Sequence, residues 1–421
     1  WIAHLTLTGL RIFFNFYIAE KILLLIYVIG TPYVFYKLIT FINPKNTNFG
    51  VILILPFIYN ILFYLGFSSF SLSILFYLLT VYYWLKIRTN LNSRKVIILF
   101  CLICLTYFSH IIFFVVLLFS TALISFVNYL TKTINFKCFI KESLFLFIAA
   151  LPSICFLFSF LNSRSFISNE ENKYLPSIEI LKDIISLRIL NVFSITDEII
   201  YSRILFLLLF LLTVIALFKK IKIHESIKFK FSIFDKIWIF LIISILSIIF
   251  LIPGSNDYIT LRLIIIFFII YITWLSFQSY SKFINYTLFF ITLFVSLSLG
   301  YKHFKITSSL NKIAKEFENA SNYIEPNSIV LPIKNSDSWF DGHFGNYLGA
   351  NRNLLIPDNY EASKDYFPVV WNEEEIPNLT IGDSLMSNCL YWKSNFNNKK
   401  KTIDYILIWG NNKYNDCLEK I

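Results

Sequence analysis

Two ionisable side chains stand inside apolar stretches of this chain, where they could bind a phosphate or a sugar. His110 ends the segment TYFSH at 106–110 and precedes a long apolar run. Its imidazole can hydrogen-bond such a ligand or transfer a proton near neutral pH. Arg262 follows PGSNDYITL at 253–261, and its guanidinium can bind a phosphate through two parallel hydrogen bonds. An ionisable group within a bilayer costs on the order of 2.5–3.5 kcal/mol on insertion scales, so both residues need an explanation.

Structural roles remain open for these two residues. His110 could cap a hairpin turn together with Ser109. Arg262 could reach lipid headgroups or pair with Asp257, five residues earlier. The pattern nevertheless favours phosphate binding by Arg262, with Asp257 as a further candidate for the same site.

Weaker candidates for substrate binding occur elsewhere in the apolar part. His4 lies in a partial helix at the start of the chain, and Tyr59 and Asn60 precede the polar segment GFSSFS at 66–71. Tyr59 and Asn60 would also suit turns and hydrogen bonds between helices. Glu198 could supply a carboxylate, but acidic residues also suit the start of the helix that follows.

The elements that must position these residues are membrane helices. Hydrophobic residues make up 57% of the chain and charged residues only 15%, against roughly 25% in soluble proteins. Only segments that satisfy their own backbone polar groups can cross a bilayer. Ten spans are predicted, after a partial helix at 2–14: 17–42, 51–65, 67–85, 97–110, 111–129, 141–162, 199–218, 236–253, 260–279 and 284–302.

Three clusters of basic residues indicate the topology. They are Lys86, Arg88, Arg94 and Lys95; Lys132, Lys137 and Lys141; and Lys219, Lys220, Lys222, Lys228, Lys230 and Lys236. An even number of spans separates each cluster from the next, so all three fall on one side, which the positive-inside rule makes cytoplasmic. The hairpin tips at 66–71 and 109–111, the loops 163–198 and 253–260, and the C-terminal tail are then outside. In the loop 163–198, the spacing of Ile178, Leu181, Ile184 and Ile185 predicts a helix along the outer interface.

The composition changes near residue 303, which predicts two domains, 1–304 and 305–421. Residues 1–304 hold 25 Lys and Arg against 11 Asp and Glu, whereas residues 305–421 hold 12 against 15. The tail shows a helical pattern at 306–322 and strand-like segments at 328–333 and 404–409. We therefore expect an all-α polytopic membrane bundle with a small C-terminal α/β domain. Aromatic and acidic residues at 337–349 and 358–372 would suit sugar binding or plain packing, which leaves the roles of His343 and Asp358 open.

Several functional classes are disfavoured. The basic residues sit in loops between apolar spans, which is unlike the polar basic surface of a nucleic-acid-binding protein. The chain lacks a phosphate-binding loop, an HExxH pair and a nucleophile elbow, and the CxxC at 101–104 has no second pair of metal ligands. Cys389 and Cys417 could form a disulfide if the tail faces an oxidising compartment. Because the sequence opens at Trp1, within a helical pattern, we expect it to be a fragment that lacks its true N-terminus.

The layout of spans, interfacial helix and C-terminal domain resembles the GT-C superfamily of integral-membrane glycosyltransferases. The segments PFIYN at 56–60, GFSSFSLS at 66–73, TYFSH at 106–110 and DNYEASKDYFPVVWN at 358–372 resemble bacterial GT-C-like membrane proteins. The resemblance implies a protein of the bacterial inner membrane that transfers a sugar from a polyprenyl-phosphate donor to a glycan, lipid or protein acceptor. It also implies an acidic catalytic residue, associated in some members with a divalent metal ion, in an external loop that would precede Trp1.

Two other functions remain as alternatives. A lipid-linked glycan flippase or transporter would show paired repeats with helices broken at mid-membrane. A glycan polymerase or ligase would carry a large external loop between spans. The sequence places its largest non-membrane segment at the C-terminus instead, which favours the transferase, with His4, Tyr59, Asn60, His110, Asp257 and Arg262 as the candidate substrate-binding residues.

Overall fold

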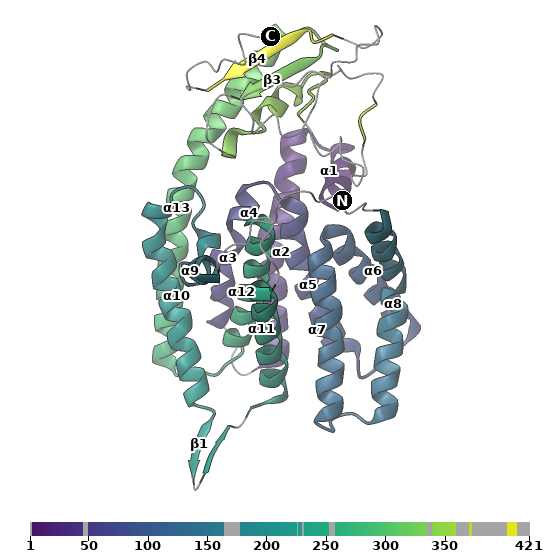
Figure 1. Ribbon diagram of the computed structural model, residues 1–421, viewed down its shortest axis with the longest axis vertical. Coiled ribbons are helices and arrows are strands. Elements are labelled where there is room, and N and C mark those ends of the chain that lie inside the picture. Colours follow the sequence, from purple (N-terminus) through teal and green to yellow (C-terminus); the bar gives the residue numbers. More distant parts are fainter. Residues whose placement is uncertain are drawn as a thin grey trace. The chain divides into compact units, whose positions relative to one another are not determined.

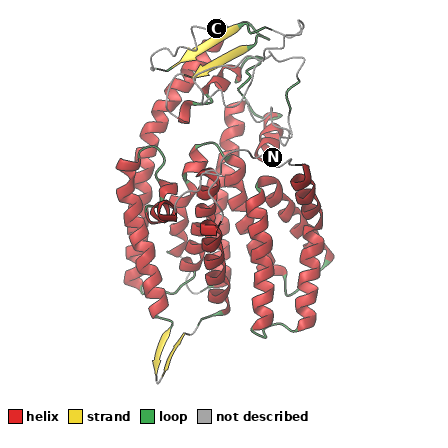
Figure 2. Cartoon of the chain, viewed as in Figure 1, coloured by secondary structure: helices red, strands yellow, loops and turns green. Residues whose placement is uncertain are grey.

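The computed structural model of the chain is mostly helical (Figures 1 and 2). It describes residues 2–44, 49–163, 177–224, 226–229, 231–251, 257–334, 339–358, 370–372 and 402–410. Cys389 and Cys417, whose pairing the sequence leaves open, and most of the segment 358–372 lie outside the described residues.

Eight helices of the described part are long and apolar enough to cross a membrane, so the chain is a multi-pass membrane protein. They are α2 (Phe16–Ile42), α5 (Ser68–Ile87), α7 (Ile111–Leu130), α8 (Phe136–Ser163), α10 (Ile195–Phe218), α11 (Ile233–Leu251), α12 (Asp257–Ser276) and α13 (Lys282–Ala320). α12 is the central helix, because every side chain from Leu263 to Ile270 is buried. α8 instead exposes large apolar side chains such as Phe147 and Phe158, as expected of a helix that faces lipid.

Two of the ten expected spans differ from a long helix. The span expected at 97–110 is α6 (Ser93–Ser109), which has 17 residues. The span expected at 51–65 is broken into η1 (Gly50–Ile54), α3 (Leu55–Ile58) and α4 (Ile61–Tyr64). The second break occurs because the buried Asn60 side chain accepts hydrogen bonds from the N–H groups of Leu62 and Phe63. That side chain thereby starts a new helix at a position where the previous one would have continued.

The broken segment still runs through the bundle. At its start, the carbonyl of Gly50 accepts a hydrogen bond from the Ser276 hydroxyl at the end of α12. A Cβ at residue 50 would lie 2.6 Å from the Ser276 carbonyl oxygen, so only glycine allows this approach. At its other end, Tyr64 packs on Phe193, just before α10. The segment therefore joins the two ends of the helix bundle.

We name these two ends by their residues. The basic end holds the connections 88–92, 131–135, 219–232 and 277–281, and the tip end holds residues 64–68 and His110. Lys219 donates to the Ser279 carbonyl, and Asn43 donates to the Phe277 carbonyl. These contacts join three connections at the basic end. All three basic clusters lie at or next to this end, as the count of spans predicts.

Shorter elements complete the first part of the chain. They are α1 (Ile2–Arg11), α9 (Ser177–Ile185), η2 (Arg188–Leu190), and the antiparallel strands β1 (Ile221–His224) and β2 (Ser226–Phe229). The interfacial helix predicted in the loop 163–198 corresponds to α9. Its packed face is Ile180 and Ile184, whereas Ile178, Leu181 and Ile185 are exposed. The predicted helix is therefore present, and its contact with the membrane interface stays a prediction.

The chain divides into two compact units, one formed by Trp1–Ser159 and Ile167–His303, the other by Phe160–Phe166 and Phe304–Ile421. α13 contributes to both units, so the span expected at 284–302 and the helix expected at 306–322 are one helix. Residues 303–306 contain neither Gly nor Pro, and nothing in them ends a helix.

The second unit has a small core built on two parallel strands, β3 (Val330–Lys334) and β4 (Tyr405–Trp409). Phe317, on the last turns of α13, packs edge to face on Trp409 of β4, with ring centroids 5.2 Å apart. The short helices η3 (Ser321–Tyr323), η4 (Trp339–Asp341) and η5 (Phe344–Gly349) supply the other described elements. Leu348 of η5 and Val330 of β3 are fully buried in this core.

Candidate functional site

The start of α5 carries two aromatic rings that meet the two strongest candidates from the sequence. The guanidinium of Arg262 lies over the Phe67 ring, 5.0 Å from its centroid. The Phe70 ring meets the His110 imidazole edge to face, with centroids 5.1 Å apart. Residues three apart on a helix share a face. The structure therefore brings Arg262 and His110 to one side of α5, at the tip end.

His110 is held by the turn between α6 and α7. Its backbone N–H donates to the Thr106 carbonyl, and its Nδ1 accepts a hydrogen bond from the N–H of Ile112 at 3.3 Å. Because Nδ1 accepts this hydrogen bond, the neutral form of the ring carries its proton on Nε2. His110 thus caps α7, which is the structural role that the sequence left open. Its ring also has one N–H donor, on Nε2.

Arg262 lies in the first turns of α12, at the tip end. Its side chain is half-buried, its Nε atom is buried, and its guanidinium carbon lies over the Phe67 ring. Tyr258, one turn earlier on α12, packs on the same Phe67 ring, with the two centroids 5.7 Å apart. The turn that presents Phe67 depends on Gly66, whose φ of 81° favours glycine. A guanidinium can bind a phosphate through two parallel N–H donors, which makes Arg262 a candidate anion-binding residue.

The other candidate substrate-binding residues from the sequence have different surroundings. Asn60 is fully buried, and its amide group donates to the Phe57 carbonyl while its oxygen caps α4. Tyr59 is 41% exposed and packs on Phe63. His4 is exposed on α1, and Asp257 is the first residue of α12, with a side chain outside the described set. Turn and packing chemistry explains Asn60 without a ligand.

A second buried pair at the tip end was not selected from the sequence. Glu198 accepts hydrogen bonds from the N–H groups of Val192, Phe193 and Ser194, and its Oε2 lies 3.4 Å from Nε2 of His303. Both side chains are at most 2% exposed. The sequence suggested that Glu198 stabilises the start of the helix that follows it. The structure agrees in part, because its carboxylate accepts hydrogen bonds from the turn just before α10. The sequence feature that could have identified its partner, His303, is a histidine at the end of an apolar span.

Aromatic rings connect this pair to the Arg262 site. His303 meets Tyr64 and Phe193 edge to face, with centroids 5.0 Å and 5.6 Å away. Tyr64 ends α4 and precedes Phe67 by three residues. The turn 64–67 therefore links the Glu198–His303 pair to the platform beneath Arg262.

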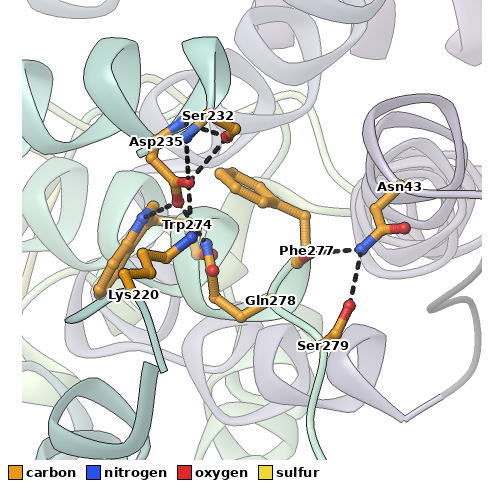
Figure 3. Close-up of polar contacts among 8 residues, drawn as sticks. All are labelled: Asn43, Lys220, Ser232, Asp235, Trp274, Phe277, Gln278 and Ser279. Carbon is orange, nitrogen blue, oxygen red and sulfur yellow. Dashed lines mark hydrogen bonds and ion pairs between the residues drawn. The ribbon is translucent and has the colours of Figure 1, made fainter. Parts of the chain in front are cut away.

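The basic end holds a separate polar cluster around Asp235, shown in Figure 3. The buried Asp235 carboxylate accepts from Lys220 at 2.5 Å, from the Ser232 N–H and hydroxyl, from Trp274 and from Gln278. Its donors come from the end of α10, the start of α11 and the end of α12. Because every lone pair is used within the chain, this cluster stabilises the helix ends and leaves no acceptor for a ligand.

A third buried carboxylate, Glu142 of α8, also lies at the basic end. It accepts from the Ser125 hydroxyl at 2.7 Å and faces Arg88 at 3.7 Å. Arg88 also donates to Asn128. This network connects α5, α7 and α8, and we assign it a structural role.

In the second unit, a histidine and a carboxylate pair as well. Nδ1 of the exposed His343 lies 3.2 Å from Oδ2 of the buried Asp358, and Asn346 donates to the same oxygen. Phe344 and Tyr347 next to them pack on the small core. Packing therefore accounts for Phe344 and Tyr347, two of the aromatic residues of 337–349.

Metal binding has no support among the described residues, where no three His, Cys, Asp or Glu side chains converge in a way that could hold an ion.

The comparisons with known proteins give no relative. No family model, curated protein or solved structure matches the chain.

Proposed function

We propose that this protein is a membrane glycosyltransferase that moves a sugar from a polyprenyl-phosphate donor to a glycan, lipid or protein acceptor at the outer face of a bacterial inner membrane. The observation that carries the proposal is the convergence of Arg262 and His110 on Phe67 and Phe70. Two of the segments that resemble GT-C-like proteins, 66–73 and 106–110, supply three of these four residues.

In this proposal the chain's own residues act on the donor phosphate. When the acceptor hydroxyl attacks the anomeric carbon, the bond from that carbon to the phosphate oxygen breaks, and negative charge grows on the departing lipid phosphate. Arg262 stabilises that charge through paired N–H donors, and the Nε2–H of His110 donates one further hydrogen bond. The hydroxyl proton passes to a general base.

The apolar surroundings suit such a ligand. A polyprenyl chain lies within the bilayer, and its phosphate lies at the level of the headgroups. The tip end offers a cation and a neutral N–H donor at the ends of spans, with aromatic rings between them. Charge-assisted hydrogen bonds are stronger there than in water, because the local dielectric constant is low.

Sugar transfer by the protein expressed from its full coding sequence tests the proposal. Purified protein in nanodiscs would be given a polyprenyl-phosphate sugar with a radiolabelled sugar, and release of the label from the lipid would be measured. We expect release by the wild type, and a loss of about 100-fold in Arg262→Ala, as for other groups that stabilise a developing anion. Wild-type protein that leaves the donor intact with every acceptor class would overturn the proposal.

Lipid-linked glycan transport is the second candidate, because two observations favour it. The Glu198–His303 pair is an ionisable pair buried between spans, which in membrane proteins often marks a transport or proton pathway. The segment 50–64 is a broken helix, although its sharpest break, at Asn60, lies only one turn from the tip end. A transporter would move the labelled lipid between leaflets of a proteoliposome without releasing its sugar.

A further inference from the structure

The start of α5, at the tip end, is a helix N-terminus without a side-chain cap. α5 begins at Ser68, and its N-cap residue is Phe67, whose side chain makes no capping hydrogen bond. A phenyl ring has no acceptor for the N–H groups that point out of the first turn of a helix. The peptide dipoles of this 20-residue helix add a positive charge of about half an elementary charge at the same point. An anion bound at the start of α5 would match both features.

Arg262 brings a full positive charge to this helix start. Its guanidinium lies over the ring of the N-cap residue Phe67, 5.0 Å from the centroid. The His110 imidazole contacts Phe70, which belongs to the first turn of α5. That turn contains neither Asp nor Glu. The guanidinium charge and the positive end of the helix therefore act on one small region, and both favour an anion there.

A buried hydroxyl one turn into α5 is an independent indication of a ligand. Ser71 is 1% exposed, and its Oγ has no hydrogen-bond partner among the residues that the structure describes. A buried hydroxyl without a partner costs free energy, so most buried hydroxyls are paired. Ser73, two residues later and equally buried, is paired in the common way, because its hydroxyl donates to the Phe70 carbonyl.

The position of Ser71 directs its hydroxyl toward the start of the helix. The backbone N–H of Ser71 donates to the Phe67 carbonyl, so the residue lies one turn beyond the N-cap. Side chains of an α-helix lean toward its N-terminus, and residues four apart share a face. The Ser71 hydroxyl therefore leans over the turn of Phe67, on whose ring the Arg262 guanidinium lies.

We propose that the start of α5 binds the phosphate group of the lipid donor, which accepts hydrogen bonds from the N–H groups of the first turn and from the Ser71 hydroxyl, while Arg262 supplies the charge. The lipid part of this ligand rests on the proposed function, because the helix start itself selects only for a phosphate group. Ser71 is then a binding residue that the segment 66–71 contributes besides its two aromatic rings.

Binding of polyprenyl phosphate to the full chain in phosphatidylcholine nanodiscs tests the site. Ser71→Ala should raise the Kd about tenfold, as expected when a hydrogen bond to a charged group is lost. Ser73→Ala, which is matched in size and burial, should keep the wild-type Kd, because its hydroxyl is already used. The melting temperature of lipid-free Ser71→Ala should not fall, since no hydrogen bond within the described residues is lost. A Kd that stays at the wild-type value in Ser71→Ala overturns the proposal, whatever its melting temperature.

A carboxylate placed in the first turn should exclude the phosphate. Ser68→Asp puts a negative charge at the first residue of α5, where it is favoured by the helix dipole and repels a second anion. We expect the Kd to rise at least about tenfold. Ser93→Asp makes the same change at the first residue of α6, at the basic end, and should bind as the wild type does. Equal affinity in these two variants would also overturn the site.

This site and the proposed sugar transfer can fail separately. A protein that shows the expected Kd values but releases no sugar from the donor would keep the site and overturn the transferase. Sugar release together with wild-type Kd values in Ser71→Ala and Ser68→Asp would do the reverse. Inorganic phosphate, added in excess, distinguishes the two sources of the ligand: displacement of the lipid shows that the phosphate group alone suffices, and its absence shows that the lipid-linked form is required.

Discussion

The guanidinium carbon of Arg262 lies 5.0 Å from the centre of the Phe67 ring, so a cation on α12 is held by an aromatic ring at the start of α5. The two residues are almost 200 positions apart in the sequence. Their contact places the guanidinium at the tip end, and it makes the position of Arg262 depend on α5 as well as on α12.

Replacing Phe67 with Leu should weaken binding of polyprenyl phosphate by about threefold to tenfold, because a partly desolvated cation–π contact contributes about 1 kcal/mol. Phe67→Trp keeps a π face and should retain most of the affinity. Phe193→Leu is the control, since the Phe193 ring packs on Tyr64 and His303. Isothermal titration of the three variants in detergent would measure this, and equal affinity in Phe67→Leu and wild type would contradict the role given to the ring.

Substitutions of His110 can separate its cap from its N–H donor. His110→Asn retains an oxygen that can accept from the Ile112 N–H, whereas His110→Ala removes the cap at a cost of about 1 kcal/mol. We expect Asn to keep the melting temperature and Ala to lower it. Sugar release should fall in both variants if the Nε2–H contacts the donor phosphate. Full activity in the Asn variant would leave His110 with a structural role alone.

The membrane class, the helices and the grouping of basic loops followed from the sequence, because apolar length and charge bias act locally. The break at Asn60 could not be predicted in this way, because in the sequence an amide that caps a helix cannot be distinguished from any other polar residue in a span. The continuity of α13 was missed for a related reason. The composition changes near residue 303, but a change of solvent exposure does not end a helix.

The candidate site was predictable only in its parts. His110 and Arg262 stood out because ionisable groups are rare in spans, yet their meeting on Phe67 and Phe70 is a property of packing. The Glu198–His303 pair needed the fold, because residues 105 positions apart in sequence carry no mark of their contact. Asp257 and His4 remain predictions.

Loss of the Glu198 charge should destabilise the turn before α10. Glu198→Gln replaces an oxygen that accepts backbone N–H groups by a donor, and leaving such buried groups unpaired costs about 1–3 kcal/mol each. Asp197→Asn, next to it on the exposed side of the helix, is the matched control and should be nearly neutral. Thermal unfolding in detergent measures both, and similar melting temperatures for the two variants would show that the Glu198 contacts contribute little.

The Asp235 cluster predicts strong coupling at the basic end. Asp235→Ala leaves Lys220, Trp274 and Gln278 without their shared acceptor and should cost about 3–5 kcal/mol, as when one partner of a buried ion pair is removed. Adding Lys220→Ala should cost little more, because the lysine has already lost its partner. Additive losses in this double-mutant cycle would mean that the pair does not act as a unit.

The most direct test of the account is the affinity of the tip end for a lipid phosphate. Binding of polyprenyl phosphate to nanodisc-embedded wild type, Arg262→Ala and Arg203→Ala would be measured side by side, since Arg203 is an exposed arginine of α10 and its loss makes the same charge change. The account predicts a Kd raised at least about tenfold in Arg262→Ala, from lost charge-assisted hydrogen bonds, and unchanged in Arg203→Ala. Equal Kd values in wild type and Arg262→Ala would contradict it.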